Sequence, residues 1–311
     1  MAAIAPVSAT PMYKLDETWP EDASHFKAQI FCTDVLSFGE TSEVYVAQRG
    51  DVKSKMLVFS ENGVLLRSWD TEQIDMPHGV RVRVPVGHGL TEAEIWVTDV
   101  GNGRVGCCLK MFDREGTLKT TIGTPGESGT SLNPLQFDQV GDVAFNEAGE
   151  MFVVDGDGGM NNRLLKLSTD HNLLWSVGGK GSAPGLFSVP HCVEVDRYGQ
   201  VWVADRKNRR IQVFHGDTGA YIGEWALDED VYTARFSADK SHILALQMKV
   251  RRILVIAAPK EPGNLGDCEV IDSIQMKEGT QPHLLSVSQS TGAIYVGDIG
   301  ANTCYKFSPL S

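Results

Sequence analysis

The 311-residue sequence lacks an uninterrupted apolar run of about 18 residues, which a membrane-spanning helix requires, so we predict no membrane span. Its N-terminus also lacks the charged and hydrophobic segments of a secretory signal peptide. The cysteines form no C-x-x-C pair and show no zinc-ribbon spacing. They are Cys32, Cys107, Cys108, Cys192, Cys268 and Cys304. Together these features favour free thiols in a reducing compartment, and we predict a cytoplasmic location.

Positive charge is also scarce. The sequence has 28 Lys and Arg against 40 Asp and Glu, which gives a formal net charge of −12. Its basic cluster, residues 206–210, is short, and we interpret it as a solvated turn. Because phosphate binding requires clustered Lys and Arg, we predict that nucleic acid is not a partner. We expect a small molecule as the partner, and the sequence leaves the oligomeric state open.

What the sequence does contain is a repeated pattern of short strands. Apolar residues alternate with polar ones, helical periodicity is almost absent, and 32 glycines are spread along the chain. A unit of three alternating strands, with a turn that often contains aspartate after the second, occurs six times. The first strands of the six copies are Asp34–Phe38, His78–Val82, Asp142–Phe145, His191–Val195, Thr233–Phe236 and His283–Val287.

Six such copies predict an all-β chain that folds as a six-bladed β-propeller. Each blade packs against its neighbours and is unstable alone, so we expect residues 26–311 to form a single domain. We predict that residues 1–25 are an N-terminal arm or a segment that closes the ring.

Copies two, four and six begin with a proline followed by a histidine. The three histidines are His78, His191 and His283. Because first strands line the central channel of a propeller, alternate blades would direct these imidazoles to one point at intervals of about 120°. Three imidazoles with a free fourth position are the ligand set of a catalytic zinc ion, although iron or another divalent metal also suits imidazole.

A single histidine at the start of a strand is usually a satisfied polar residue at the rim of a sheet, whereas three in register favour a shared metal. At the comparable place the other copies carry Asp34, Asp142 and the Tyr232–Thr233 segment, which would contribute polar groups. We expect the remaining histidines to be solvated. They are His25, His88, His171, His215 and His242.

Two arginines follow second strands, Arg49 in copy one and Arg206 in copy four. A guanidinium group binds a carboxylate through two parallel hydrogen bonds, so both are candidates for holding an acidic substrate. The alternative is that either arginine pairs with an aspartate of a neighbouring blade.

Residues 203–214, Val-Ala-Asp-Arg-Lys-Asn-Arg-Arg-Ile-Gln-Val-Phe, resemble the signature of NHL-repeat propellers. Met76–Val80, Gly185–His191 and Gln281–His283 extend the resemblance to the peptidyl-α-hydroxyglycine α-amidating lyases, over residues 34–307. This resemblance implies a six-bladed propeller whose zinc is held by His78, His191 and His283, with Arg49 and Arg206 in the active site. The reaction that it implies cleaves a carbinolamide into a primary amide and glyoxylate.

The sequence departs from that family at two functional positions. The family carries a structural calcium bound by a carboxylate directly after the third histidine, and Leu284 at this position makes calcium doubtful, although the carbonyls of Leu36 and Val80 could remain. The family also has a catalytic tyrosine in the turn that here contains Asp157, which could replace it as a base. Tyr232, a metal-bound hydroxide and the substrate itself are alternative sources of the base.

We therefore predict a metal-dependent lyase that acts on a small hydroxylated, carboxylate-bearing substrate, and not authentic peptide amidation. A non-catalytic NHL scaffold and a propeller hydrolase of the lactonase type are the alternatives. Lactonases of this fold favour a carboxylate-rich calcium site, which three histidines do not resemble.

Overall fold

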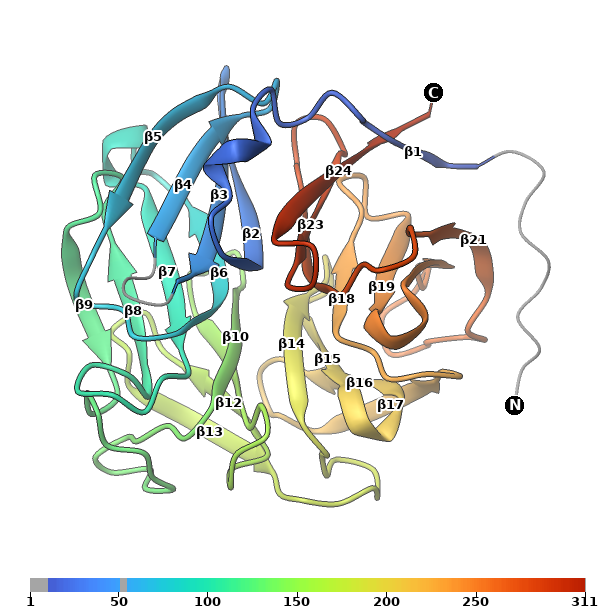
Figure 1. Cartoon of the computed structure of the whole chain (residues 1–311). Coiled ribbons are helices and arrows are strands. Elements are labelled where there is room, and N and C mark those ends of the chain that lie inside the picture. The colour runs from blue at the N-terminus through green and yellow to red at the C-terminus, as the bar shows by residue number, and fades with distance from the viewer. Residues whose placement is uncertain (1–10, 51–54, 311) are drawn as a thin grey trace.

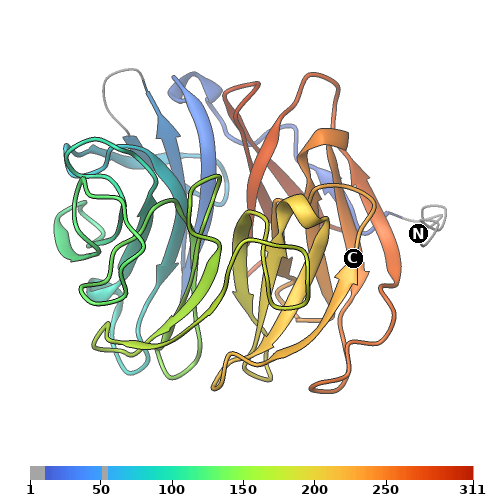
Figure 2. The same ribbon diagram turned by 90° about the horizontal axis from the view of Figure 1, so that it is seen from below.

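The computed structural model describes residues 11–50 and 55–310 of the chain. These residues form six antiparallel four-stranded sheets, which radiate from a central axis in Figure 1 and stand side by side in Figure 2. The prediction of an all-β, six-bladed propeller is confirmed. The innermost strands surround the central channel, and three-residue 3-10 turns are the only helices in the described part of the chain.

In each blade the first strand is innermost and the following strands pair in order toward the outside. Blade one contains β2 (Gln29–Phe38), β3 (Thr41–Arg49), β4 (Lys55–Ser60) and β5 (Leu65–Asp70). Blade two contains β6 (Pro77–Arg83), β7 (Glu94–Asp99), β8 (Cys108–Phe112) and β9 (Leu118–Ile122). Blade three contains β10 (Val140–Phe145), β11 (Met151–Asp155), β12 (Arg163–Leu167) and β13 (Leu173–Gly178).

Blade four contains β14 (Pro190–Val195), β15 (Gln200–Asp205), β16 (Arg210–His215) and β17 (Tyr221–Ala226). Blade five contains β18 (Thr233–Phe236), β19 (His242–Gln247), β20 (Arg252–Ala257) and β21 (Val270–Gln275). Blade six contains β22 (Pro282–Val287), β23 (Ile294–Asp298) and β24 (Thr303–Pro309), with β1 (Tyr13–Leu15) as its outer strand. The 3-10 turns are η1 (Ala23–His25), η2 (Leu90–Glu92), η3 (Arg206–Asn208) and η4 (Met248–Val250).

Strand β1 joins the N-terminal segment to the C-terminal blade by antiparallel pairing with β24. Its Tyr13 is buried, and the phenolic oxygen lies 2.7 Å from Nε2 of His242 in blade five. The expectation that His242 is solvated is therefore wrong, because this histidine is 5% exposed and binds the ring-closing strand. The boundary between residues 1–25 and 26–311 stays a prediction.

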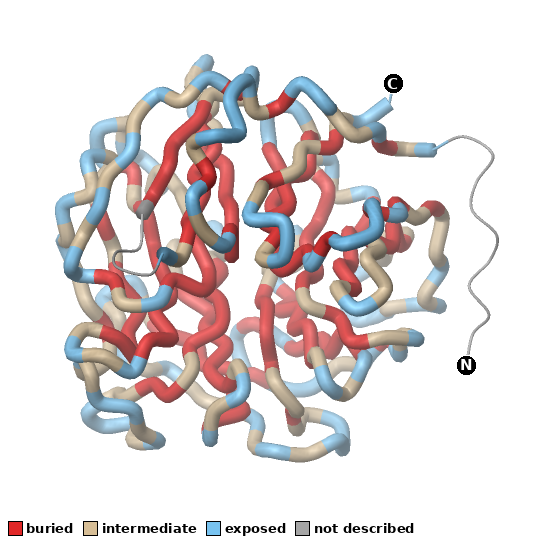
Figure 3. Tube along the Cα trace, in the orientation of Figure 1, coloured by how far each residue is buried: buried red, intermediate tan, exposed pale blue. Residues whose placement is uncertain are grey.

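The hydrophobic core lies between neighbouring blades. Figure 3 shows the buried inner strands and the exposed loops around the rims. Trp202 in blade four is 1% exposed, and the centroid of its ring lies 5.5 Å from that of Phe236 in blade five. Because such side chains are buried only when two blades meet, the stability of each blade depends on its neighbours.

A buried carboxylate at the end of the second strand fixes the start of the innermost strand in four blades. These residues are Asp99, Asp155, Asp205 and Asp298, and none has measurable exposure. Each accepts hydrogen bonds from backbone N–H groups just before the first strand of its own blade. Asp205, for example, accepts from Ser188 at 2.7 Å, close to Pro190 and His191. In blade one the amide oxygen of Gln48 accepts from Lys27 in the same way.

Replacement of Tyr13 by phenylalanine tests the closure of the ring. The variant keeps the buried ring but leaves His242 without its hydroxyl partner, so we expect Tyr13→Phe to lower the free energy of unfolding by about 1–2 kcal/mol. Urea denaturation measures this loss. Lys14→Ala, which changes an exposed side chain of the same strand, is the control, and equal losses in both variants would contradict the role of the hydroxyl.

Candidate metal centre

His78, His191 and His283 meet at the centre of the propeller. Their ring centroids lie 4.8 to 5.0 Å apart, and each pair of rings meets edge to face. The three side chains come from β6, β14 and β22, the innermost strands of alternate blades. Their exposed fractions are 1%, 0% and 4%, so the cluster is shielded from bulk solvent.

A β-bulge carries each of these histidines. The register of β14 shifts between Pro190 and Cys192, which leaves His191 as the extra residue. Similar shifts in β6 and β22 include His78 and His283. A bulge twists its strand and redirects a side chain, and bulges are frequent beside active sites. Proline tolerates such positions because it has no N–H group to place in the ladder, so the Pro-His pairs also mark the bulges in the sequence.

Each histidine is held by a backbone carbonyl of the following blade. The pairs are Nδ1 of His78 with Gly141 at 2.7 Å, Nδ1 of His191 with Tyr232 at 2.7 Å, and Nδ1 of His283 with Phe31 at 3.1 Å. A carbonyl oxygen only accepts, so Nδ1 carries the proton. In each neutral ring Nε2 then keeps its lone pair as the available metal ligand.

The three carbonyl groups belong to the places in blades one, three and five that are equivalent to the histidines. The residues there are Phe31, Gly141 and Tyr232. The expectation that Asp34 and Asp142 lie at this level is wrong, because both follow it along β2 and β10 and lie deeper in the channel. The Tyr232–Thr233 segment does reach it. Phe31 also belongs to the site, because its ring centroid lies 4.7 Å from that of His283. The sequence analysis missed this residue.

The donor set of this cluster fits a divalent metal ion. The ligand atoms of the three imidazoles lie within 4.8 Å of one another. Burial holds the pKa of His191 and of His283 well below the usual range, so both rings are neutral at pH 7. Within residues 11–50 and 55–310, the Nε2 atoms of His78 and His191 are buried and make no hydrogen bond of normal geometry. Neutral imidazoles with unpaired Nε2 atoms are good ligands for zinc.

Asp157 lies against the histidine cluster from the rim of blade three. Its Oδ2 is 2.9 Å from Nε2 of His78, and its Oδ1 is 3.8 Å from Nε2 of His191. Its backbone N–H donates to the carbonyl of Gln139 at 2.9 Å, which holds the turn in place. Burial raises the pKa of Asp157, but positive charge at the histidine cluster and on the Arg206 guanidinium outweighs burial and holds this pKa well below its usual range.

Arg49 is the last residue of β3 and Arg206 directly follows β15, the second strands of blades one and four, which lie on opposite sides of the ring in Figure 1. Nε of Arg49 donates to the carbonyl of Pro77 at 2.8 Å, and its guanidinium lies over the ring of Phe31 at 3.2 Å. Nη1 of Arg206 lies 3.0 Å from Oδ1 of Asp157. Arg206 is thus paired with an aspartate of the neighbouring blade, as the alternative interpretation proposed.

Both arginines retain a buried donor. Among the residues that the structure describes, Nη2 of Arg49 and Nε of Arg206 have no hydrogen-bond partner. Burial lowers the pKa of Arg49 to about 10, so it remains charged at pH 7. An unpaired buried donor is costly, and an anionic ligand would satisfy such a donor.

The interpretation of residues 206–210 as a solvated turn is wrong for two of its arginines. Arg206 faces the histidine cluster through Asp157, and its side chain is 15% exposed. Arg210 is buried, and its Nε donates to Oδ2 of Asp205 at 2.8 Å. It neutralises the carboxylate that fixes the start of β14.

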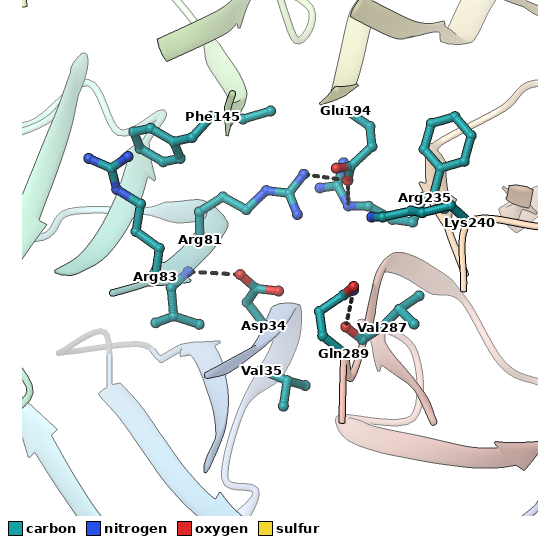
Figure 4. A pocket seen from close by; sticks show the side chains of 13 residues that line it. Asp34, Val35, Arg81, Arg83, Phe145, Glu194, Arg235, Lys240, Val287 and Gln289 are labelled. Carbon is teal, nitrogen blue, oxygen red and sulfur yellow. Dashed lines mark hydrogen bonds and ion pairs between the residues drawn. The ribbon is translucent and has the colours of Figure 1, made fainter. Parts of the chain in front are cut away.

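The other end of the channel is closed by an ion-pair layer. We define this layer as Asp34, Arg81, Asp142, Glu194 and Arg235, some of which Figure 4 shows directed toward one another. Nη2 of Arg81 lies 2.9 Å from Glu194, and Nη2 of Arg235 lies 2.6 Å from Asp142. A cavity of about 190 Å³ lies at this end, three residues along β6 from His78, and it lacks the histidines.

Leu284, which follows the third histidine, is 2% exposed and belongs to an apolar cluster with Leu36 and Val80. The six cysteines, all in the described part of the chain, are free thiols. No helix within residues 11–50 and 55–310 is long and apolar enough to cross a membrane. That Leu284 makes calcium doubtful, and that the protein is cytoplasmic, stay predictions.

Comparison with known proteins gives the family of the chain. Residues 187–214 match the NHL repeat. NHL repeat-containing protein 3 of Mus musculus is 44% identical over 303 residues, which cover 96% of this chain and 85% of that protein. The chain belongs to the family of NHL repeat-containing protein 3. It is also distantly related to the peptidyl-α-hydroxyglycine α-amidating lyases, as the sequence resemblance predicted.

A further relative and one solved structure span nearly the whole propeller. Peptidyl-alpha-hydroxyglycine alpha-amidating lyase 2 of Drosophila melanogaster is 23% identical, over 96% of this chain and 75% of that protein. The crystal structure of virginiamycin B lyase from Staphylococcus aureus superimposes with a TM-score of 0.63 at 11% identity, over 96% of this chain and 100% of that one. At this identity the second likeness shows the fold alone.

The burial of Asp34 in the ion-pair layer predicts how the stability of the protein depends on pH. Burial raises the pKa of Asp34 to about 6, so the folded protein binds this proton more tightly than the unfolded chain does. The contribution of Asp34 to stability is therefore most favourable at low pH, where the side chain is protonated, and is lost as the pH rises through 6. We expect Asp34→Asn to increase the free energy of unfolding by about 2 kcal/mol at pH 7.5 and by less at pH 5.

Glu194→Gln is the matched comparison for Asp34→Asn. Although burial raises the pKa of Glu194, Arg81 and Arg235 outweigh burial and lower this pKa to about 2. Its stabilising contribution is present above the ordinary glutamate pKa and is lost only as the pH falls toward 2. Urea denaturation should therefore show a loss of stability of similar size at pH 5 and pH 7.5. A gain for Asp34→Asn that does not grow with pH would contradict the burial argument.

Proposed function

We propose that the chain is a metal-dependent lyase that acts on a small hydroxylated substrate bearing a carboxylate. His78, His191 and His283 would hold one divalent ion, which we propose to be zinc. The observation that carries this proposal is the convergence of three buried imidazoles whose Nδ1 atoms are all fixed by carbonyl groups of the next blade. Bound there, the ion would polarise an oxygen of the substrate.

Arg49 and Arg206 are the reason for proposing a substrate that bears a carboxylate. Nη2 of Arg49 and Nε of Arg206 are buried donors without partners among the described residues, on opposite sides of the histidine cluster. A planar carboxylate accepts hydrogen bonds from such groups and is held in a defined orientation. The Drosophila relative is named for its action on peptidyl-α-hydroxyglycine, whose hydroxyl and carboxylate groups have this chemistry.

Asp157 is the base in this proposal. Its carboxylate is ionised and lies at the histidine cluster beside Arg206, within reach of a hydroxyl proton on a substrate bound there. Because aspartate stands where the lyases have a catalytic tyrosine, we propose a substrate other than the glycine-extended peptides of authentic amidation.

A non-catalytic scaffold is the second candidate. It is favoured by the name of the relative with 44% identity, which states a repeat and no reaction. A propeller that only binds a partner does not require a metal, so the metal content separates the two candidates.

Metal analysis of the purified protein is the first test. We expect about one zinc ion per chain, because one cluster of three histidines is present. His191→Ala should lose this metal, and zinc should raise the melting temperature of the wild type but not of the variant. His215→Ala, which changes an exposed histidine, should retain the metal. A wild-type protein that binds no metal after reconstitution would refute the lyase proposal and leave the scaffold.

Binding of glyoxylate to the zinc-loaded protein tests the carboxylate site. Arg49→Met keeps the contact with Phe31 but removes the charged donor, so we expect the dissociation constant to rise roughly 10- to 100-fold. Isothermal titration calorimetry measures this change. Arg104→Met removes an exposed arginine elsewhere and should leave the affinity unchanged. Equal affinities in Arg49→Met and wild type would exclude Arg49 from the substrate site.

A further inference from the structure

The carboxylate of Asp157 makes an unfavourable contact unless a cation joins it to the histidines. Its Oδ2 lies 2.9 Å from Nε2 of His78, which is an acceptor because Nδ1 of that ring donates to Gly141. Two acceptors at this distance repel each other. A positive charge between them converts the repulsion into two favourable contacts.

The distances match those between ligands that share one ion. Adjacent ligands of a tetrahedral zinc ion, with bonds of about 2.0–2.1 Å, lie roughly 3.3 Å apart. The two carboxylate oxygens of Asp157 lie 2.9 Å from His78 and 3.8 Å from His191. These separations fall on either side of that value. A proton on Nε2 of His78 would explain the first distance alone, because the second oxygen approaches the ring of His191, whose Nδ1 already donates to the carbonyl of Tyr232.

The turn that carries Asp157 holds this carboxylate beside the histidines. Gly156 and Gly158, on either side, have φ angles of 155° and 85°, which favour glycine. The N–H groups of Gly156 and Asp157 both donate to the carbonyl of Gln139, at 2.8 and 2.9 Å. The backbone of the turn is thus held by two hydrogen bonds, and Met160 in the same turn is exposed.

We propose that Asp157 is a fourth protein ligand of the metal in the resting protein and that the carboxylate of the substrate displaces it. This inference rests on the proposed function. Asp157 already has the contacts that a substrate carboxylate needs, since Nη1 of Arg206 lies 3.0 Å from its Oδ1. A bound substrate would take over Arg206, use the free donor of Arg49, and release Asp157 to act as the base.

Displacement sets a requirement on the ligand. A side chain tethered beside the metal competes at an effective concentration in the millimolar range or above. A simple monocarboxylate such as acetate, which cannot also bind through a hydroxyl group, should therefore compete poorly. The internal carboxylate would exclude common cellular acids and admit ligands that have both groups.

Zinc affinity and the visible spectrum of the cobalt-substituted protein test this inference without an activity assay. We expect Asp157→Asn and Asp157→Ala to lower the affinity for zinc about 10-fold or more, measured by competition with a chelating dye. We expect acetate to change the cobalt spectrum of both variants at concentrations that leave the wild-type spectrum unchanged. Met160→Ala, in the same turn, should behave as wild type, and urea denaturation should show that all three variants are folded.

The possible failures are distinguishable. If the wild type binds zinc and both Asp157 variants match it in zinc affinity and in response to acetate, the fourth ligand is refuted and the three-histidine centre remains. The fourth ligand is equally refuted if Met160→Ala loses zinc as strongly as the Asp157 variants, because the loss then comes from disturbance of the turn. If the wild type binds neither zinc nor cobalt, the proposed function fails together with this inference.

Discussion

The rest of the structure depends on the buried carboxylates that end the second strands of the blades. Backbone N–H groups that enter the interior must find acceptors, and the segments that lead into the innermost strands have no neighbouring strand to supply them. Asp205 accepts from Ser188 at this point, and Arg210 balances its charge. Asp99 and Lys110 form a corresponding pair in blade two. Each buried carboxylate, through its hydrogen bonds to the preceding segment, sets where a first strand begins and hence which residue occupies the bulge.

A second constraint couples the blades around the channel. Each histidine donates to a carbonyl of the next blade, so blades two, four and six supply the imidazoles while blades three, five and one orient them. Neither set forms the cluster alone. The centre is therefore a property of the closed ring, and the pairing of β1 with β24 contributes to it from the outside of blade six. A metal held there would in turn connect three blades that are not adjacent.

The sequence was sufficient to predict features that repeat. Alternation and six copies gave the propeller, and the shared Pro-His pairs identified three residues that the structure brings together. The prediction that Asp34 and Asp142 lie at the same depth as the histidines was wrong, because the sequence pattern did not show where the inner strands of those blades begin. Strand β2 begins at Gln29, five residues before Asp34, and its bulge at Phe31 carries an apolar side chain that resembles core. Alternation does not reveal a bulge, so the register of blade one could not be read from the sequence.

Contacts between distant segments were equally hidden. Nothing near His242 in the sequence indicates that Tyr13 covers it, because 229 residues separate the two. The burial of Arg210 follows from its pairing with Asp205 across adjacent strands, which a count of charges in a short basic run does not reveal.

The candidate centre divides its chemistry between two kinds of structural element. The imidazoles come from bulges in the inner strands. Arg49 ends the second strand of blade one, whereas Asp157 and Arg206 lie in the connections that follow the second strands of blades three and four. Inner strands are constrained by packing on both faces, but connections at the rim tolerate replacement. A lineage could therefore keep three histidines while it exchanged tyrosine for aspartate in the turn of blade three. Under the proposed function, such an exchange would alter which ligands enter and how a proton is moved, and it would leave the fold and the three histidines in place. It accounts for a chain that resembles amidating lyases along its whole propeller while carrying a carboxylate at the centre of its site.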